Sequence, residues 1–199
     1  MSKKTITWLI VGGVILVLIM WATTIYNKMV NGDEQTTQAW SQVENVYQRR
    51  ADLIPNLVKT VQGAADFEKG TLEAVIEARS QATSIKIDPA NMTAENLAAF
   101  QKAQDNLSSA LSRLMVVVER YPELKANRNF LELQAQLEGT ENRIAVERKK
   151  FTEEVKKYNA YIRHFPNNMM ANMFGFEKKA YFEATAGAEK APGVEFDFE

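Results

Sequence analysis

Two patterns of apolar residues divide this chain: an unbroken run near the start and spaced stripes along the rest. Residues 5–27 contain no charged side chain, and apolar side chains fill most of positions 6–25. A helix of about 20 apolar residues is long enough to span a hydrocarbon core of about 30 Å. We therefore predict a cytoplasmic tip and transmembrane anchor over residues 1–27. The side chains assigned to the anchor are Ile6, Trp8, Leu9, Ile10, Val11, Val14, Ile15, Leu16, Val17, Leu18, Ile19, Met20, Trp21 and Ile25.

A cleaved signal peptide is the alternative interpretation of this run. Its apolar region normally covers about 7–15 residues and ends at an A-x-A-like site. The run here is longer, and residues 21–26 make a poor cleavage site, so a retained anchor is favoured. Lys3 and Lys4 precede the run, and the positive-inside bias then places the N-terminus in the cytoplasm and the rest of the chain outside it.

Beyond the run, apolar residues recur at the three- and four-residue spacing of amphipathic helices. No stretch before the C-terminal end alternates with the period of two that a strand requires. Four stripes with short connections predict an all-α fold, an antiparallel helical bundle of about four helices over residues 28–165. The stripes are Trp40, Val43, Tyr47, Ala51, Ile54, Val58 and Val61; Leu72, Val75, Ile76, Arg79 and Ala82; Leu97, Phe100, Gln104, Leu107, Leu111, Leu114, Val118 and Tyr121; and Leu137, Ile144, Phe151, Val155, Tyr158, Ile162 and Phe165.

Proline residues and capping signals mark the predicted helix ends. Pro55 is the only proline in residues 6–62 and either kinks one long helix or begins a new one. The kink is favoured, because the apolar stripe keeps its phase across the proline. Thr93 is a predicted N-cap. Pro122 is expected to end the third helix at Tyr121, because the residue before a proline avoids the helical region.

The charge balance and the lack of certain residue types exclude most kinds of catalytic chemistry for this chain. The chain has 25 acidic and 24 basic residues, so it lacks the basic surface of a nucleic-acid binder. Without cysteine it has no disulfide, thiolate zinc site or thiol nucleophile. His164 is the only histidine, and one imidazole cannot supply a histidine metal cage or the paired Glu-x-x-His motifs of a di-metal bundle. We therefore expect no enzymatic activity, no cofactor and no metal.

Charged residues at one level of two helices form a candidate network. The first helix carries Arg49, Arg50 and Asp52, and the last carries Glu141 and Arg148, seven residues apart on one face. The favoured interpretation is a partly buried network that fixes helix register. The alternatives are a ligand site, or solvated faces joined by ordinary ion pairs of about 0.3–0.5 kcal/mol each.

The last 34 residues, 166–199, form a predicted tail that is irregular and rich in aromatic residues. Residues 194–199 alternate apolar with acidic side chains, as an edge strand or an extended docking peptide does. Three interpretations stay open: the tail folds back on the bundle, contacts another copy or another protein, or is disordered. Methionine and phenylalanine are over-used at adaptable interfaces. The candidate contact residues are Met169, Met170, Met173, Phe174, Phe176, Tyr181, Phe182, Phe196 and Phe198.

Several motifs resemble a known family. They include Ala-Trp-Ser-Gln-Val at 39–43, Arg-Arg-Ala-Asp-Leu-Ile-Pro-Asn-Leu-Val at 49–58, Tyr-Pro-Glu-Leu-Lys-Ala-Asn at 121–127 and Leu-Glu-Gly-Thr-Glu-Asn-Arg-Ile at 137–144. Over residues 20–198 the chain resembles the LemA family. The resemblance implies a bacterial protein with one N-terminal transmembrane helix, an antiparallel helical bundle and no established enzymatic activity. It also implies roles in membrane remodelling, sensing or the cell envelope, by analogy.

The anchor, the long helix that leaves it and the aromatic tail together suggest a function. We expect a non-enzymatic scaffold in the bacterial inner membrane that self-associates and organises or remodels that membrane. Its partners would be the lipid bilayer and further copies of the chain, and no nucleic acid. The alternative is a monomeric receptor or accessory subunit that binds an envelope or signalling protein.

Overall fold

The computed structural model describes residues 2–63 and 67–182. Within them no strand is present, so the predicted all-α class is confirmed. The elements are α1 (Lys3–Gln62), α2 (Lys69–Ser84), the 3-10 helix η1 (Pro89–Asn91), α3 (Ala94–Val118), α4 (Pro122–Lys125), α5 (Arg128–Arg163) and α6 (Asn167–Phe174).

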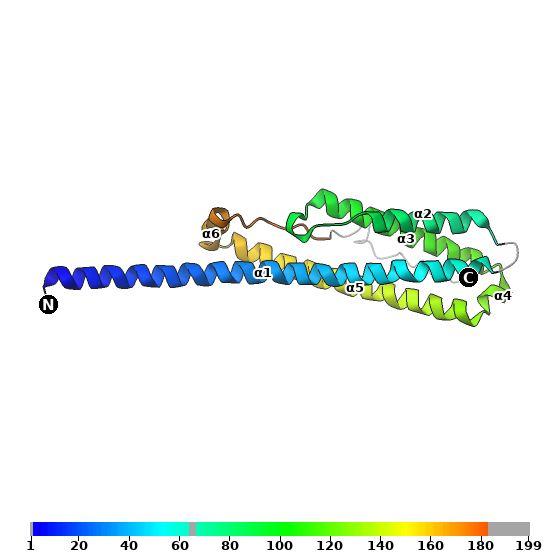
Figure 1. Cartoon of the computed structure of the whole chain (residues 1–199), viewed down its shortest axis with the longest axis horizontal. Helices are drawn as coiled ribbons and strands as arrows, with labels where there is room; N and C mark the ends of the chain where they lie inside the picture. The colour runs from blue at the N-terminus through cyan, green and yellow to red at the C-terminus, as the bar shows by residue number, and fades with distance from the viewer. Residues whose placement is uncertain (1, 64–66, 183–199) are drawn as a thin grey trace, which may run out of the picture.

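Helix α1 runs without interruption from the apolar run into the bundle. Its 60 residues make a helix about 90 Å long. Figure 1 shows α5 packed antiparallel to the C-terminal part of α1. Helices α2 and α3 form a second antiparallel pair beside α1 and α5. The N-terminal part of α1 projects beyond the bundle, and none of its most apolar 18-residue window is buried. By length and composition this is a helix able to cross a membrane.

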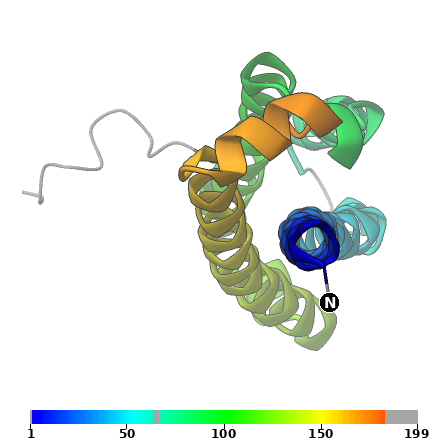
Figure 2. The same cartoon turned by 90° about the vertical axis from the view of Figure 1, so that its left-hand side faces the viewer.

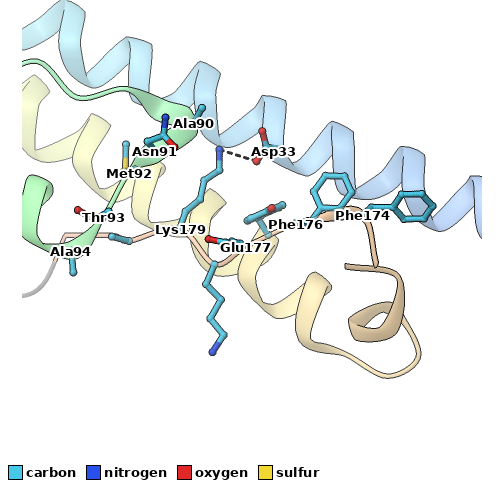
Figure 3. A pocket seen from close by; sticks show the side chains of 14 residues that line it. Asp33, Ala90, Asn91, Met92, Thr93, Ala94, Phe174, Phe176, Glu177 and Lys179 are labelled. Atoms are coloured by element: carbon cyan, nitrogen blue, oxygen red, sulfur yellow. Dashed lines mark ion pairs between the residues drawn. The ribbon is translucent and has the colours of Figure 1, made fainter. Parts of the chain in front are cut away.

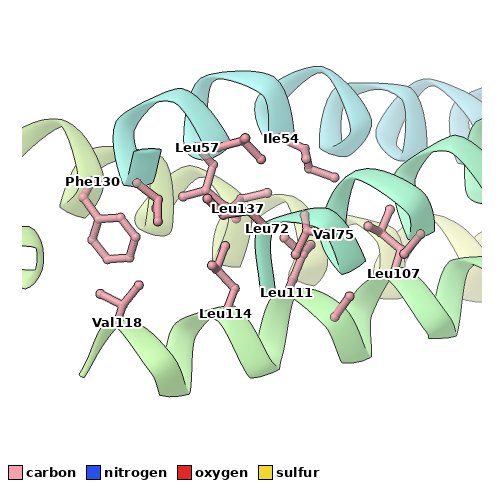
Figure 4. Packing of buried hydrophobic residues seen from close by; sticks show 14 of the residues in the cluster. Ile54, Leu57, Leu72, Val75, Leu107, Leu111, Leu114, Val118, Phe130 and Leu137 are labelled. Carbon is pink, nitrogen blue, oxygen red and sulfur yellow. The ribbon is translucent and has the colours of Figure 1, made fainter. Parts of the chain in front are cut away.

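Three apolar clusters hold the bundle together along its length. The first lies where α1, α2, α3 and α5 meet at the end far from the N-terminus, and includes Ile54, Val75, Leu114 and Phe130 (Figure 4). The second surrounds Trp40 in the middle of the bundle. The third joins α1, α5 and α6 and is built on Ile25, Met29, Tyr158, Ile162 and Ala171.

Most members of the four predicted stripes are buried, as expected for core positions. Phe165 and Ile76 are exceptions, because both side chains are exposed. Phe165 continues the seven-residue spacing of the α5 stripe in the sequence. However, α5 ends at Arg163, and because Phe165 lies beyond the helix its side chain is not on the buried face. Gln104 and Arg79, the polar members of two apolar stripes, bond to neighbouring helices.

One predicted helix end is wrong, and one segment is more regular than predicted. Helix α3 ends at Val118 rather than at Tyr121, because the Arg120 and Tyr121 amides bond three residues back, to Val117 and Val118, and close the helix with tight turns. Pro122 then begins α4. The tail is also less irregular than expected, since its first part forms α6. The predicted N-cap is confirmed, because the Thr93 hydroxyl accepts from the Asn96 amide at 3.2 Å.

Pro55 lies inside α1 and leaves one carbonyl of that helix without its usual partner. A proline has no N–H, so it cannot bond to the carbonyl four residues before it, that of Ala51. Arg79 of α2 supplies the missing donor, with its Nε 2.7 Å from the Ala51 oxygen. This bond explains why an arginine stands in the apolar stripe of α2.

We expect Arg79→Met to lower the free energy of unfolding by about 1–3 kcal/mol, because the Ala51 carbonyl loses its donor. In a Pro55→Ala background the new residue 55 amide can bond that carbonyl, and the cost of Arg79→Met should fall below about 0.5 kcal/mol. A double-mutant cycle by chemical denaturation measures the difference. An equal cost in both backgrounds would contradict the assigned pairing.

Candidate functional site

A strap of eight residues, 175–182, returns from α6 along the bundle and contacts residues far from it in the sequence. Gly175 ends α6 in the left-handed conformation (φ 75°), which glycine adopts without steric cost. The strap then reaches α5, where the Asn159 side chain holds the backbone of Lys179. The Asn159 amide donates to the Lys179 carbonyl at 2.8 Å, and its oxygen accepts from the Lys179 N–H at 3.0 Å.

Lys179 ties the strap to two further elements (Figure 3). Its Nζ lies 2.8 Å from a carboxylate oxygen of Asp33 on α1 and 3.3 Å from the carbonyl oxygen of Pro89 in η1. The lysine side chain is almost buried, so this ion pair is shielded from solvent more than one at the surface. The strap is therefore fixed in position by charge and by backbone hydrogen bonds.

An open cavity of about 780 Å³ lies beside this ion pair, between the strap and the segment that leads into α3 (Figure 3). Burial and the nearby Asp33 carboxylate raise the pKa of Tyr158, which lines the cavity, to about 12, so its hydroxyl stays protonated at neutral pH. The Asp33 charge is paired with Lys179. Among residues 2–63 and 67–182, no group of three His, Cys, Asp or Glu side chains could hold a metal ion. The cavity can bind polar groups, but these residues give it no activated nucleophile.

The end of the strap is an aromatic anchor point in the core. Phe182 is buried against Trp40 and Phe151, with ring centroids at 6.1 and 5.7 Å. The guanidinium of Arg148 lies over the Phe182 ring, 4.2 Å from its centroid. Trp40 also contacts the Phe100 ring, so this one cluster joins α1, α3, α5 and the strap.

Arg50 is the centre of a polar layer through the bundle. Its Nη1 donates to Glu141 of α5 and to Ser108 of α3, both at 2.7 Å. Its Nη2 donates to the carbonyl and the side-chain oxygen of Gln104, at 3.2 and 2.6 Å. The Gln104 amide donates in turn to the carbonyl of Ala82 near the end of α2, at 3.1 Å. Four helices are therefore joined by one buried guanidinium and one buried amide.

The predicted charged network is only partly brought together. Arg50 and Glu141 meet, but Arg49 and Asp52 lie on the exposed face of α1, where Asp52 accepts a bond from Gln48. Arg148 packs on the Phe182 ring of the strap rather than on a carboxylate. Sequence reasoning missed Gln104 and Ser108, and the signal for Gln104 was a polar residue inside an apolar stripe.

The candidate contact residues of the tail divide into three groups. Met170, Phe176 and Phe182 pack against their own chain. Met169, Met173, Phe174 and Tyr181 are exposed. Phe196 and Phe198 lie outside the described residues. The fourteen anchor residues lie along α1, and all but Ile25 are exposed.

The fold and these sites define a membrane-associated helical bundle carried on one apolar N-terminal helix. The LemA family matches the chain over residues 39–196. The chain belongs to the LemA family, which confirms the resemblance found in the sequence.

Curated relatives with similar sequences come from three bacteria. Magnetosome protein MamQ 2 of Paramagnetospirillum magneticum is 29% identical in an alignment of 175 residues that covers 79% of this chain and 64% of the relative. Magnetosome protein MamQ of Magnetospirillum gryphiswaldense is 28% identical over 87% of this chain and 71% of the relative. Protein LemA of Metamycoplasma hominis is 21% identical over 80% of this chain and 69% of the relative. The chain thus spans somewhat less than two thirds of the length of the first of these.

Proposed function

We propose that the protein is a non-enzymatic scaffold anchored in the bacterial inner membrane, which self-associates and organises or remodels that membrane. The main observation that supports this proposal is that α1 is one continuous helix. Because residues 6–25 and the bundle share one helix, every anchored copy would hold its bundle along the same axis. Lys3 and Lys4 support a cytoplasmic N-terminus and an extracytoplasmic bundle. The similarity to MamQ proteins, which are named as magnetosome proteins, supports a role at a membrane-associated structure.

Part of the tail packs against its own chain, so only the remaining part is proposed as the self-association element. Removing residues 167–199 would also remove Phe182, which packs into the core of the bundle. It would remove Lys179 as well, which forms an ion pair with Asp33. Loss of assembly after that deletion would therefore be ambiguous. We instead propose residues 183–199 as the contact element, because their final apolar and acidic alternation suits an extended docking peptide.

Light scattering tests the proposal on the full chain in mild detergent, and on residues 23–199 without detergent. Residues 23–199 keep Ile25 and Tyr26, which pack against α5, α6 and the strap. We expect a discrete assembly larger than one chain, and its loss on deletion of residues 183–199 with an unchanged melting temperature. A monomer in both samples, or an assembly that survives this deletion, would contradict the proposal as stated.

The open cavity beside Lys179 favours a second candidate, a monomeric receptor or accessory subunit for an envelope or signalling protein. Its polar lining is accessible to a partner without any rearrangement of the helices. A stable complex of fixed stoichiometry, isolated after cross-linking in cells and weakened by Asn91→Ala in the cavity wall, would support this candidate, provided that the chain alone is monomeric.

A further inference from the structure

Helix α6 closes the end of the bundle from which the apolar part of α1 emerges. In Figure 1 it is the part of the bundle nearest the N-terminus, and beyond it α1 continues alone. The Tyr26 ring of α1 contacts both Phe174 at the end of α6 and Phe176 of the strap, with centroids at 5.0 and 5.7 Å. Tyr26 directly follows the last anchor residue, Ile25, and Lys28 is the first charged residue after the run. Helix α6 therefore lies at the level where the span would leave the bilayer.

The orientation of α6 differs from that of every long helix. Figure 2 looks along α1 from its N-terminal side, and α6 is seen lengthwise, across the front of the bundle. A helix that runs across the axis of a membrane span lies along the membrane surface. This is the orientation in which amphipathic helices bind at the boundary between headgroups and acyl chains.

One face of this segment is anchored on the bundle, and another is apolar without a cover in the described structure. Ala171 is buried, and Met170 packs in the cluster that contains Ile25 and Tyr158. By contrast, Met169 and Met173, one helical turn apart, are 63% and 66% exposed. Phe165, just before the helix, is 81% exposed, and Phe174 is 49% exposed. Four large apolar side chains gathered at one end of a bundle differ from scattered surface residues, which need no explanation.

Figure 3 shows the direction of one of these exposed side chains, Phe174. Phe174 extends along α1 toward its N-terminal part, beyond Phe176. Phe174 thus borders the segment of α1 around Tyr26, at the N-terminal end of the bundle. Aromatic rings at both ends of a span are typical of the headgroup region. The same environment would cover the face of α6.

We infer that Phe165, Met169, Met173 and Phe174 insert into the interfacial layer of the same bilayer that residues 6–25 span. The bundle would then be held to the membrane in two ways, by the span and by this apolar face. The second contact would fix the height of the bundle above the lipid. The inference rests on the proposed anchor alone. It requires neither self-association nor one particular orientation across the membrane.

The absence of cysteine allows a direct test on the full chain, reconstituted in phosphatidylcholine vesicles. Single cysteines replace Met169 or Met173 and carry an environment-sensitive fluorophore. Val116→Cys on α3 is the matched control, because Val116 is apolar and 71% exposed and lies near the end of α3 that leads to α4, at the other end of the bundle from α6 (Figure 1). Val17→Cys reports on the span itself. Circular dichroism and thermal melting confirm that each labelled protein keeps its fold.

We expect labels at 169 and 173 to emit at shorter wavelength than at 116, and to lose fluorescence when the acyl chains are brominated near the headgroups. The label at 17 is tested with acyl chains brominated near the bilayer centre, the depth at which the proposed span places it. The label at 116 should stay unquenched. An unquenched, water-like label at 169 and 173 with a quenched label at 17 would overturn the inference and leave the anchor intact. A blue-shifted but unquenched label would assign the face to a second copy, which also overturns it. An unquenched label at 17 would contradict the anchor, and with it this inference.

Discussion

Replacing Arg50 by methionine is expected to lower the free energy of unfolding by about 3 kcal/mol. Removing one partner of a buried ion pair costs about 3–5 kcal/mol, because the other is left uncompensated. Glu141 is 54% exposed and regains water, so we place the effect at the lower end of that range. The larger part of the loss falls on Gln104, whose buried side-chain oxygen accepts from Arg50. At roughly 2–4 °C per kcal/mol, the melting temperature should fall by about 6–12 °C.

Arg49→Met is the matched control for this change. Arg49 is the sequence neighbour of Arg50, but its side chain is exposed, so its replacement should change stability by less than about 0.5 kcal/mol. Denaturant unfolding of the two variants and the wild type compares them directly. Equal stabilities for the Arg50 and Arg49 variants would show that the polar layer contributes nothing to the bundle.

Phe182→Ala is expected to lower the free energy of unfolding by about 3 kcal/mol and to release the strap. Truncating a buried phenylalanine costs about 3–5 kcal/mol when the surroundings cannot close over the space. Here the strap can detach locally, so the cost is limited to the free energy that holds it in place. The Lys179 N–H, which donates to Asn159, should then exchange with solvent much faster than in the wild type.

Tyr181→Ala provides the comparison, because Tyr181 is the adjacent ring and is exposed. Its cation–π contact with Lys156, at 5.5 Å, accounts for about 0.5–1 kcal/mol at most. Hydrogen exchange measured by mass spectrometry over residues 175–182 separates the two variants. Unchanged protection of the Lys179 amide in the Phe182 variant would mean that the strap is held by the Asp33 pair and Asn159 alone.

Apolar periodicity was enough to predict the long helices and most of their buried faces. The stripe from Trp40 to Val61 is buried at every predicted position, because a long helix offers many repeats of the same signal. Helix α6 was missed because it has eight residues and three of them are asparagine, a weak helix former. Phe165 was misassigned because periodicity continues in a sequence even where the helix has ended.

The polar contacts were harder to predict because each depends on residues far apart in the sequence. Glu141 lies 91 positions from Arg50 and has no periodic relation to it. Lys179 and Asp33 pair only because the strap folds back along α5. Gln104 and Arg79 did carry a usable signal, since each is a polar residue at a position where the helix face demands an apolar one. In both cases that residue bonds a backbone carbonyl of a neighbouring helix.

In the proposed anchored state, the unbroken length of α1 would make the protein a mechanical lever. Residues 26–62 extend about 55 Å beyond the apolar run. Membrane helices accommodate a thinner bilayer by tilting, and their average tilt is about 20°. A stiff helix tilted by that angle moves its far end sideways by roughly 20 Å, which is about the width of two helices. A change in bilayer thickness of a few ångströms would therefore be converted into a large lateral displacement of the distal core around Leu114 and Phe130.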